Sequence, residues 1–269
     1  MQQQISHVLG ALDDKINLSL RMNETLEAMA RAIFKDWFVD FGPVRAKMEG
    51  REPYLSPEIW DLFPARLDDE GKPEGWYTSV VGDEFTLTMG QAPPGDSYNA
   101  NHIGVPFFQG RTDFGPRYPT IRMFCTQPTR LAYRDDTLVS VRAPVGEINM
   151  APEKCCIGRG VAAVRHRLGG RSYTYQAVKQ IQEQIRVFED TGTVFGSINK
   201  KQFRSLSAMR PSDNLVSEFE KLCEPFDERI RQNVFENQKL RQMRDILLPR
   251  LISGEAEIRD AEIGSGDAA

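Results

Sequence analysis

The stretch LDDKINLSLRMNETLEAMARAIF, residues 12–34, recurs in altered form as FDERIRQNVFENQKLRQMRDILL, residues 226–248. The two stretches align without a gap at an offset of 214 residues. Identical residues fall at Asp13 and Asp227, Ile16 and Ile230, Asn23 and Asn237, Leu26 and Leu240, and Met29 and Met243. One chain therefore carries two versions of the same segment, and they are separated by nearly the whole of the remaining sequence.

Each copy has apolar or small residues at alternating spacings of three and four, which are the a and d positions of a heptad repeat. Neither copy has a second apolar face, so each helix needs a partner for its single stripe. The economical partner is the other copy, while two unrelated surface helices on one core are the alternative. The predicted seam consists of Leu12, Ile16, Asn23 and Leu26 in the first copy and Ile230, Asn237, Leu240 and Leu247 in the second.

Length and composition are those of a chain with one core and an elongated attachment, since 40% of its 269 residues are hydrophobic. No apolar run approaches the roughly 18 residues that a membrane span needs. The start MQQQISHVLG does not resemble a signal peptide. We therefore expect a soluble, cytoplasmic protein without a membrane partner. Four cysteines without a C-x-x-C spacing favour reduced, buried thiols over disulfides or a metal site.

The net charge of −4 conceals an uneven distribution. Residues 76–204 contain 16 Lys and Arg against 11 Asp and Glu, a net charge of +5. The rest of the chain has 18 basic and 27 acidic residues, a net charge of −9. This asymmetry permits the middle segment to bind a polyanion, although a basic face is also compatible with simple solvation.

The sequence predicts an α+β protein with five segments. A first long helix is expected in residues 1–41, a linker in 42–74, a mixed domain in 75–211, a second long helix in 212–253 and a flexible tail in 254–269. Prolines and glycines interrupt the linker repeatedly, apart from a short helical turn expected at 58–63. In the domain, TLVSV (137–141) and GVAAV (160–164) read as strands, and 172–188 reads as one helix.

Motifs for independent catalysis are missing from the sequence. It has no G-x-x-x-x-G-K-[ST] loop for nucleotides, no G-x-G-x-x-G after a strand, and no Asn/Asp-Pro-Pro-aromatic signature of amino-methyltransferases. The three histidines show no metal-ligand spacing. We therefore expect no catalytic residue, metal or cofactor in this chain.

Basic and polar residues in the predicted loops suit DNA binding instead. Arginine makes bidentate contacts to guanine, whereas lysine and serine reach phosphates. For each of these residues an ordinary solvated loop side chain is the alternative. The candidate DNA-contacting residues are Arg111, Arg117, Arg122, Arg142, Arg159, Ser197, Lys200 and Lys201.

Five stretches resemble the specificity (S) subunits of Type I restriction–modification systems. LDDKINLSLRMNETLEAMARAIFKDWFVDFGPVRAK closely resembles the central conserved region of that family. LVSVRAPVGEINMA, CCIGRGVAAVR and GTVFGSINKKQF resemble parts of its target recognition domain. KLRQMRDILLPRLISGEAEI resembles its C-terminal conserved helix. Together these stretches extend the resemblance over nearly the whole chain.

The resemblance implies a non-catalytic subunit with target recognition domains and two conserved helices that pair antiparallel. Each recognition domain of the family reads half of a split site in double-stranded DNA. The S subunit docks methyltransferase (M) subunits, which bind S-adenosylmethionine, and the complex recruits restriction (R) subunits, which use ATP and Mg.

This chain shows two helices but one recognition domain, so it resembles a half-size S subunit. A second copy would complete a reader of a palindromic site, and a complementary half-chain would do so for an asymmetric site. Two further hypotheses remain: a scaffold that docks M subunits without reading DNA, and a free-standing enzyme, which the missing signatures oppose.

Overall fold

The computed structural model describes residues 2–189 and 196–253, with the side chains of residues 9–189 and 196–249. It divides into two units, one of Met1–Ala28 with Phe226–Ala269 and one of Met29–Pro225, and each is described by itself. The predicted α+β class is confirmed. The tail expected at 254–269 lies outside the described residues. No described helix is long and apolar enough to cross a membrane.

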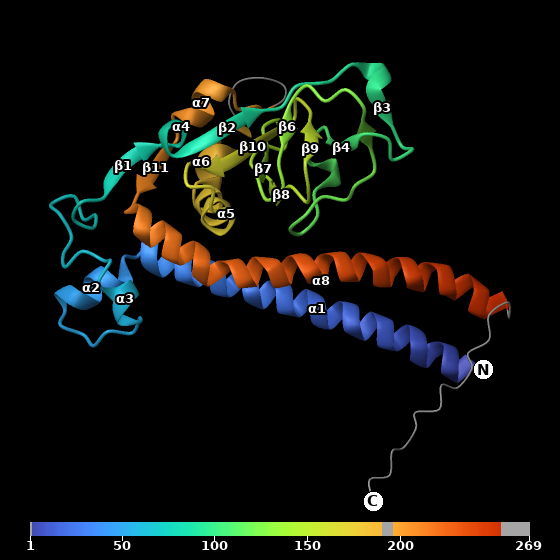
Figure 1. Cartoon of the computed structure of the whole chain (residues 1–269), viewed down its shortest axis with the longest axis horizontal. Helices are drawn as coiled ribbons and strands as arrows, with labels where there is room; N and C mark the ends of the chain where they lie inside the picture. Colours follow the sequence, from blue (N-terminus) through green and yellow to red (C-terminus); the bar gives the residue numbers. More distant parts are fainter. Residues whose placement is uncertain (1, 190–195, 254–269) are drawn as a thin grey trace, which may run out of the picture. The chain divides into compact units, whose positions relative to one another are not determined.

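The described residues form two long helices, a set of short ones and three small sheets (Figure 1). The helices are α1 (Gln2–Phe38), α2 (Gly42–Met48), α3 (Pro57–Trp60), α4 (Val81–Glu84), α5 (Arg171–Gln180), α6 (Gln182–Arg186), α7 (Lys200–Arg204) and α8 (Asp213–Ser253). The strands are β1 (Tyr77–Val80), β2 (Phe85–Met89), β3 (Tyr98–Asn99), β4 (Val105–Phe108), β5 (Phe124–Cys125), β6 (Leu131–Ala132), β7 (Thr137–Ser140), β8 (Ile148–Met150), β9 (Cys155–Ile157), β10 (Val161–His166) and β11 (Ser207–Arg210).

In the first unit, α1 and α8 pair antiparallel along the predicted stripe. The opposite sequence order is visible in two contacts: Asn233 Nδ2 donates to Asn23 Oδ1 at 2.8 Å, and Arg244 Nη1 donates to Asp13 Oδ1 at 2.8 Å. Of the eight predicted seam residues, Ile16, Asn23, Ile230, Asn237 and Leu240 are buried, and Leu12, Leu26 and Leu247 are half-buried.

The polar layer in this seam does not pair the two aligned asparagines, Asn23 and Asn237, with each other. Asn23 instead meets Asn233, one helical turn earlier, and the Asn237 Nδ2 donates to the Ile16 carbonyl at 3.5 Å. The reason is geometric. Sequence alignment places the two copies in the same direction, whereas antiparallel pairing sets each residue against its mirror position. Ser19 is the counterpart of Asn233 in the other copy, and it is buried as well.

Truncating Asn23 alone should destabilise the pair. Asn23→Ala leaves the buried Asn233 amide without its acceptor, which costs about 1–3 kcal/mol. Asn23→Leu combined with Asn233→Leu removes both polar groups. This double variant should recover that stability but hold its register less tightly, because a buried polar pair specifies one alignment. Urea unfolding and light scattering measure the two effects. Asn17→Ala on the exposed face of α1 is the control, and an equal loss in that variant would contradict the assignment.

The second unit contains the mixed domain, whose centre is the predicted strand pair. β7 and β10 occupy the segments TLVSV and GVAAV and pair antiparallel, with Val161 opposite Ser140. They form the inner strands of a sheet ordered β2-β10-β7-β8, and a second sheet is ordered β3-β5-β4-β9-β6. Side chains of both sheets share one core, which consists of Phe108, Ala132, Leu138, Ala151, Cys155, Ile157, Val161 and Ala163.

One helix of this domain differs from the sequence prediction. The single helix expected at 172–188 is divided into α5, α6 and a 3-10 turn, because the backbone at Ile181 (φ −94°, ψ 6°) leaves the helical region.

The cysteines are buried, as the sequence predicted. Within the described residues Cys125, Cys155, Cys156 and Cys223 form no disulfide.

Residues 42–74 are folded, so the prediction of a linker is wrong. Val44 and Ala46 of α2 are fully buried, and the ring of Phe63 packs edge-on against Trp37 of α1 at 5.4 Å between centroids. Two of the prolines that suggested a linker, Pro43 and Pro57, begin helices, since they lie in the first turns of α2 and α3. The short turn expected at 58–63 is α3, Pro57–Trp60.

Candidate DNA interface

Four loops of the domain are joined by backbone hydrogen bonds into what we call the loop platform, residues 109–112, 141–144, 158–160 and 196–198. The Gly160 amide donates to the Gln109 carbonyl at 3.0 Å, and the Val141 amide donates to the Gly160 carbonyl at 2.9 Å. The Ile198 amide donates to the Val141 carbonyl at 3.1 Å. Because each loop bonds to at least one other, the four backbone segments of the platform are fixed relative to one another.

Glycine permits the close approach of two of these loops. A Cβ atom on Gly160 would lie 2.6 Å from the Gln109 carbonyl oxygen, and one on Gly158 would lie 2.9 Å from the Gln109 Cα. Both distances are too short for any side chain. The glycines therefore bring Arg159, which stands between them, against the loop that carries Arg111.

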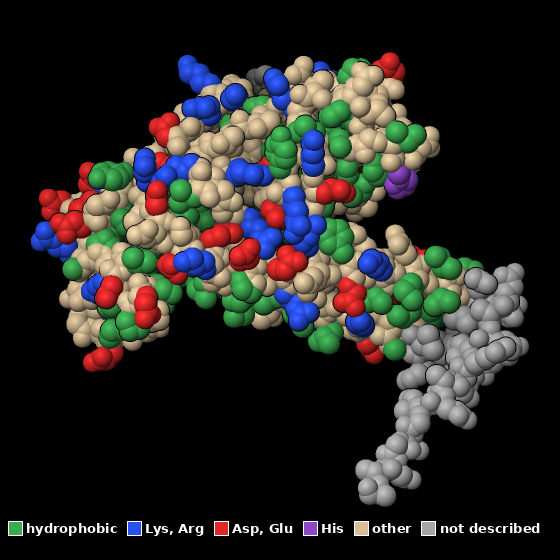
Figure 2. All heavy atoms as spheres, viewed as in Figure 1, with side chains coloured by type: hydrophobic (Ala, Val, Ile, Leu, Met, Phe, Trp, Pro, Cys, Tyr) green, Lys and Arg blue, Asp and Glu red, His purple; other side chains and the backbone are tan. Residues whose placement is uncertain are grey.

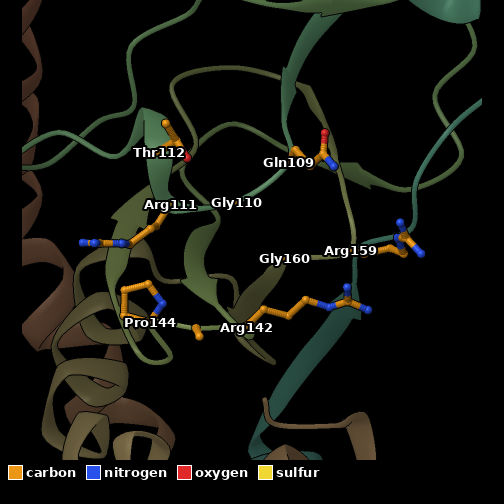
Figure 3. Close-up of a pocket in the computed structure, with 9 residues that line it drawn as sticks. Gln109, Gly110, Arg111, Thr112, Arg142, Pro144, Arg159 and Gly160 are labelled. Atoms are coloured by element: carbon orange, nitrogen blue, oxygen red, sulfur yellow. The ribbon is translucent and has the colours of Figure 1, made fainter. Parts of the chain in front are cut away.

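Three predicted residues, Arg111, Arg142 and Arg159, line one pocket of about 310 Å³ on the platform (Figure 3). All three are exposed, and none forms an ion pair within the described part of the chain. In Figure 3 the side chains of Arg142 and Arg159 extend in the same direction, and that of Arg111 extends the opposite way. The platform thus presents unneutralised guanidinium groups from segments that are distant in sequence.

Arg117 was predicted to contact DNA, and the structure contradicts this. Its side chain is 2% exposed, and its guanidinium lies over the ring of Tyr175 at 3.5 Å from the centroid. This cation–π contact makes Arg117 part of the domain core. Arg122 is exposed but carries a partner, since its Nε donates to Asp113 Oδ1 at 2.6 Å. A DNA contact by Arg122 would have to share or break that ion pair.

Ser197 is part of the loop platform, and Lys200 and Lys201 follow it in the chain at the start of α7. Ser197 is exposed and forms an isolated β-bridge with Arg142. Asn199 then starts α7 with a reciprocal capping box, in which its side chain accepts from the Gln202 amide at 3.0 Å. Both lysines are exposed in the first turn of α7. Figure 2 shows basic side chains over α7 on the face drawn. Residues 192–195 of the quoted stretch GTVFGSINKKQF lie outside the described residues.

Arg130 is a further exposed basic residue near the platform, and the sequence alone did not identify it as a candidate for DNA contact. Its carbonyl accepts from the Ile157 amide at 3.0 Å, which places it beside the strand that leads to Arg159. Its side chain is exposed, and within the described ranges it forms no ion pair. No local motif distinguishes Arg130, and only the pairing of β6 with β9 brings it to this position.

His166 lies away from the platform, buried between the rings of Phe85 and Tyr173. Its Nδ1 accepts from the Leu168 amide at 3.3 Å, so the imidazole is held neutral. Burial lowers the pKa of His166 to about 4, assisted by Arg167 and Arg210 and opposed by Glu84 and Asp213.

Acidification should therefore destabilise the domain through His166. The unfolded imidazole binds a proton near its ordinary pKa of 6.5 and the folded one only near 4. The free energy of unfolding is therefore unaffected by the protonation of His166 above pH 6.5. It decreases by up to about 3 kcal/mol as the pH falls towards 4, because the unfolded state takes up the proton first. Urea unfolding of the wild-type protein and of His166→Gln at several pH values isolates the pH-dependent loss of stability that His166 causes. Parallel pH profiles of the two proteins would contradict it.

Comparison with known proteins supplies relatives over almost the entire chain. No protein-family model matches the chain. A Methanocaldococcus jannaschii protein, provisionally assigned as the specificity subunit of the type I restriction enzyme MjaX, is 28% identical over 262 residues, 96% of this chain and 58% of that protein. The HindI specificity subunit of Haemophilus influenzae is 25% identical, over 94% of this chain and 67% of that protein. The chain is related to the specificity subunits of Type I restriction enzymes. It spans about three fifths of the length of its M. jannaschii relative.

Solved structures of specificity subunits share the fold. The S subunit from M. genitalium superposes with a TM-score of 0.62 at 16% identity, covering 93% of this chain and 60% of that one. The HsdS subunit from Thermoanaerobacter tengcongensis superposes with a TM-score of 0.51 at 23% identity, covering 92% and 56%. At these identities the similarity establishes the fold alone.

Proposed function

We propose that this chain reads a DNA sequence on behalf of a Type I restriction–modification complex, through the loop platform and α7. The observation that carries the proposal is that Arg111, Arg142 and Arg159, without ion-pair partners among the described residues, line one pocket of the hydrogen-bonded loop platform. The relatives are named specificity subunits of restriction enzymes, which favours DNA as the polyanion.

The two groups of basic residues suit different contacts. Arg142 and Arg159 extend together from fixed loops, and a planar guanidinium in a fixed position suits bidentate contact with a base edge, guanine above all. Lys200 and Lys201 are exposed on a short helix, and flexible ammonium groups suit phosphates. We therefore assign sequence preference to the arginines and general affinity to the lysines.

The paired helices are the proposed docking surface for M subunits. In the first unit, apolar side chains stay exposed outside the seam at Leu18, Met22, Met243 and Ile246. The M subunits would supply S-adenosylmethionine, and R subunits would supply ATP and Mg chemistry. No group of His, Cys, Asp or Glu in the described part of the chain is arranged to hold a metal ion.

A split site needs two recognition domains, and the described residues contain one. A second copy of this chain and a complementary half-chain remain equal candidates for the other domain. A palindromic target would favour the first and an asymmetric target the second.

Selection from randomised duplexes tests the proposal. The chain is purified together with a methyltransferase (M) subunit of a Type I system, and bound duplexes are sequenced. We expect one enriched sequence. Equal recovery of all duplexes despite a stable complex would favour the scaffold hypothesis, and methylation by the chain alone would favour the enzyme hypothesis.

A further inference from the structure

The N-terminus of α5 is capped by a side chain from another helix. Gly170 occupies the cap position of α5 and offers no side chain, so the first amides of the helix need another acceptor. Glu220 of α8 supplies it. Its carboxylate accepts from the amides of Arg171 at 3.0 Å, Ser172 at 2.9 Å and Tyr173 at 3.1 Å. A negative charge at this end of a helix also interacts favourably with the helix dipole.

The contact depends on close approach at Gly170. A Cβ atom there would lie 2.8 Å from Glu220 Oε2, so a larger residue would push the carboxylate away. The hydroxyl of Ser172 adds a further hydrogen bond to Glu220 at 3.3 Å. One carboxylate thus holds the whole first turn of α5.

Further contacts fix the same part of α8 to the domain within residues 29–225. Arg167 Nη1 donates to Asp213 Oδ2 at 3.1 Å, at the start of α8. Arg171 Nη2 lies 3.6 Å from Glu224 Oε1, one turn beyond Glu220. Glu220 stands between these two ion pairs, and it is the residue that binds backbone rather than a mobile side chain. It therefore constrains orientation more strongly than either flanking pair.

We propose that Glu220 is a positioning residue that sets the orientation of the recognition domain on its spacer helix, and hence the spacing between the DNA half-sites. This inference rests on the proposed DNA-reading function. The Glu220 carboxylate binds the first turn of α5, so its loss should alter the accepted spacing and leave the bases preferred by the loop platform unchanged. A residue that merely stabilised the fold would affect both equally.

Spacing selectivity tests the role directly. The selected half-sites are offered to the complex at their preferred separation and at separations one and two base pairs longer or shorter. Glu220→Ala and Glu220→Gln should reduce the discrimination between spacings by about fivefold or more, the factor expected for losing one helix cap. Glu218→Gln is the matched control, because within the described ranges Glu218 pairs only with Lys221 on the same helix. Unchanged spacing selectivity in the Glu220 variants would overturn the inference.

A second measurement needs no DNA. Spin labels at Lys154 of the domain and Ser217 of α8, both exposed, report their separation in the full chain. We expect a narrow distribution in wild-type protein and Glu218→Gln, and a broad one in the Glu220 variants, with faster hydrogen exchange at residues 171–173. An unchanged distribution refutes the positioning role. If wild-type protein instead shows no base preference, the proposed function fails, and the label distances still decide the role of Glu220.

Discussion

Replacing Arg142 and Arg159 together by alanine is expected to remove most of the preference for the target sequence while the protein remains folded. Both side chains are exposed and lie outside the core, so stability should change little. A guanidinium that reads a base edge contributes about 1–3 kcal/mol of discrimination, and the two are expected to add. The affinity of the complex for its selected duplex should thus approach its affinity for a scrambled duplex.

Lys200→Ala with Lys201→Ala gives the contrasting result. Loss of two phosphate contacts should weaken binding to all duplexes alike and reduce the slope of log affinity against log salt by about two. Titrations of selected and scrambled duplexes over a range of salt concentrations separate the two kinds of contact. Arg66→Ala, an exposed arginine paired with Glu74 outside the domain, serves as the control. Uniform weakening in the double arginine variant would assign Arg142 and Arg159 to phosphates instead.

Phe219→Ala should produce the largest loss of stability. Phe219 of α8 is fully buried, and its ring lies 5.6 Å from that of Phe34 and 5.5 Å from that of Phe38, both on α1. It also lies 6.3 Å from the ring of Tyr173 on α5. One side chain therefore joins three helices, and its truncation leaves a cavity that costs about 3–5 kcal/mol.

Urea unfolding at neutral pH measures this loss. Leu222→Ala, on the same helix and 38% exposed, is the control and should cost far less. An equal loss of stability in the two variants would show that the packing of Phe219 against Phe34, Phe38 and Tyr173 does not stabilise the contact between these helices. A loss in Phe219→Ala without any change in cooperativity is the result we expect, because the ring contacts of Phe219 lie within the one unit of residues 29–225.

Local patterns predicted the elements whose causes are local. The heptad spacing identified both long helices, and β-branched runs identified β7 and β10. Patterns that depend on distant partners were less reliable. The repeat alone could not show that Asn23 meets Asn233, because that contact follows from chain direction. Prolines at 43 and 57 suggested a linker, but in the folded chain they begin α2 and α3.

The candidate site shows the same division. Composition selected eight loop residues, yet it could not distinguish exposed Arg142 from buried Arg117, since both are arginines in predicted loops. Arg117 packs against the ring of Tyr175, which lies 58 positions further along the chain, and this contact accompanies its burial. Arg130 and Glu220 were missed because their importance depends on pairing with β9 and α5, and neither residue stands in a recognisable motif.

The most direct test of DNA reading by this chain is an affinity ratio. The complex of this chain with its methyltransferase partner is titrated with the selected duplex and with a scrambled duplex of the same composition, at one salt concentration. We expect a preference of about a thousandfold or more for the selected duplex. Equal affinity for the two duplexes would contradict it.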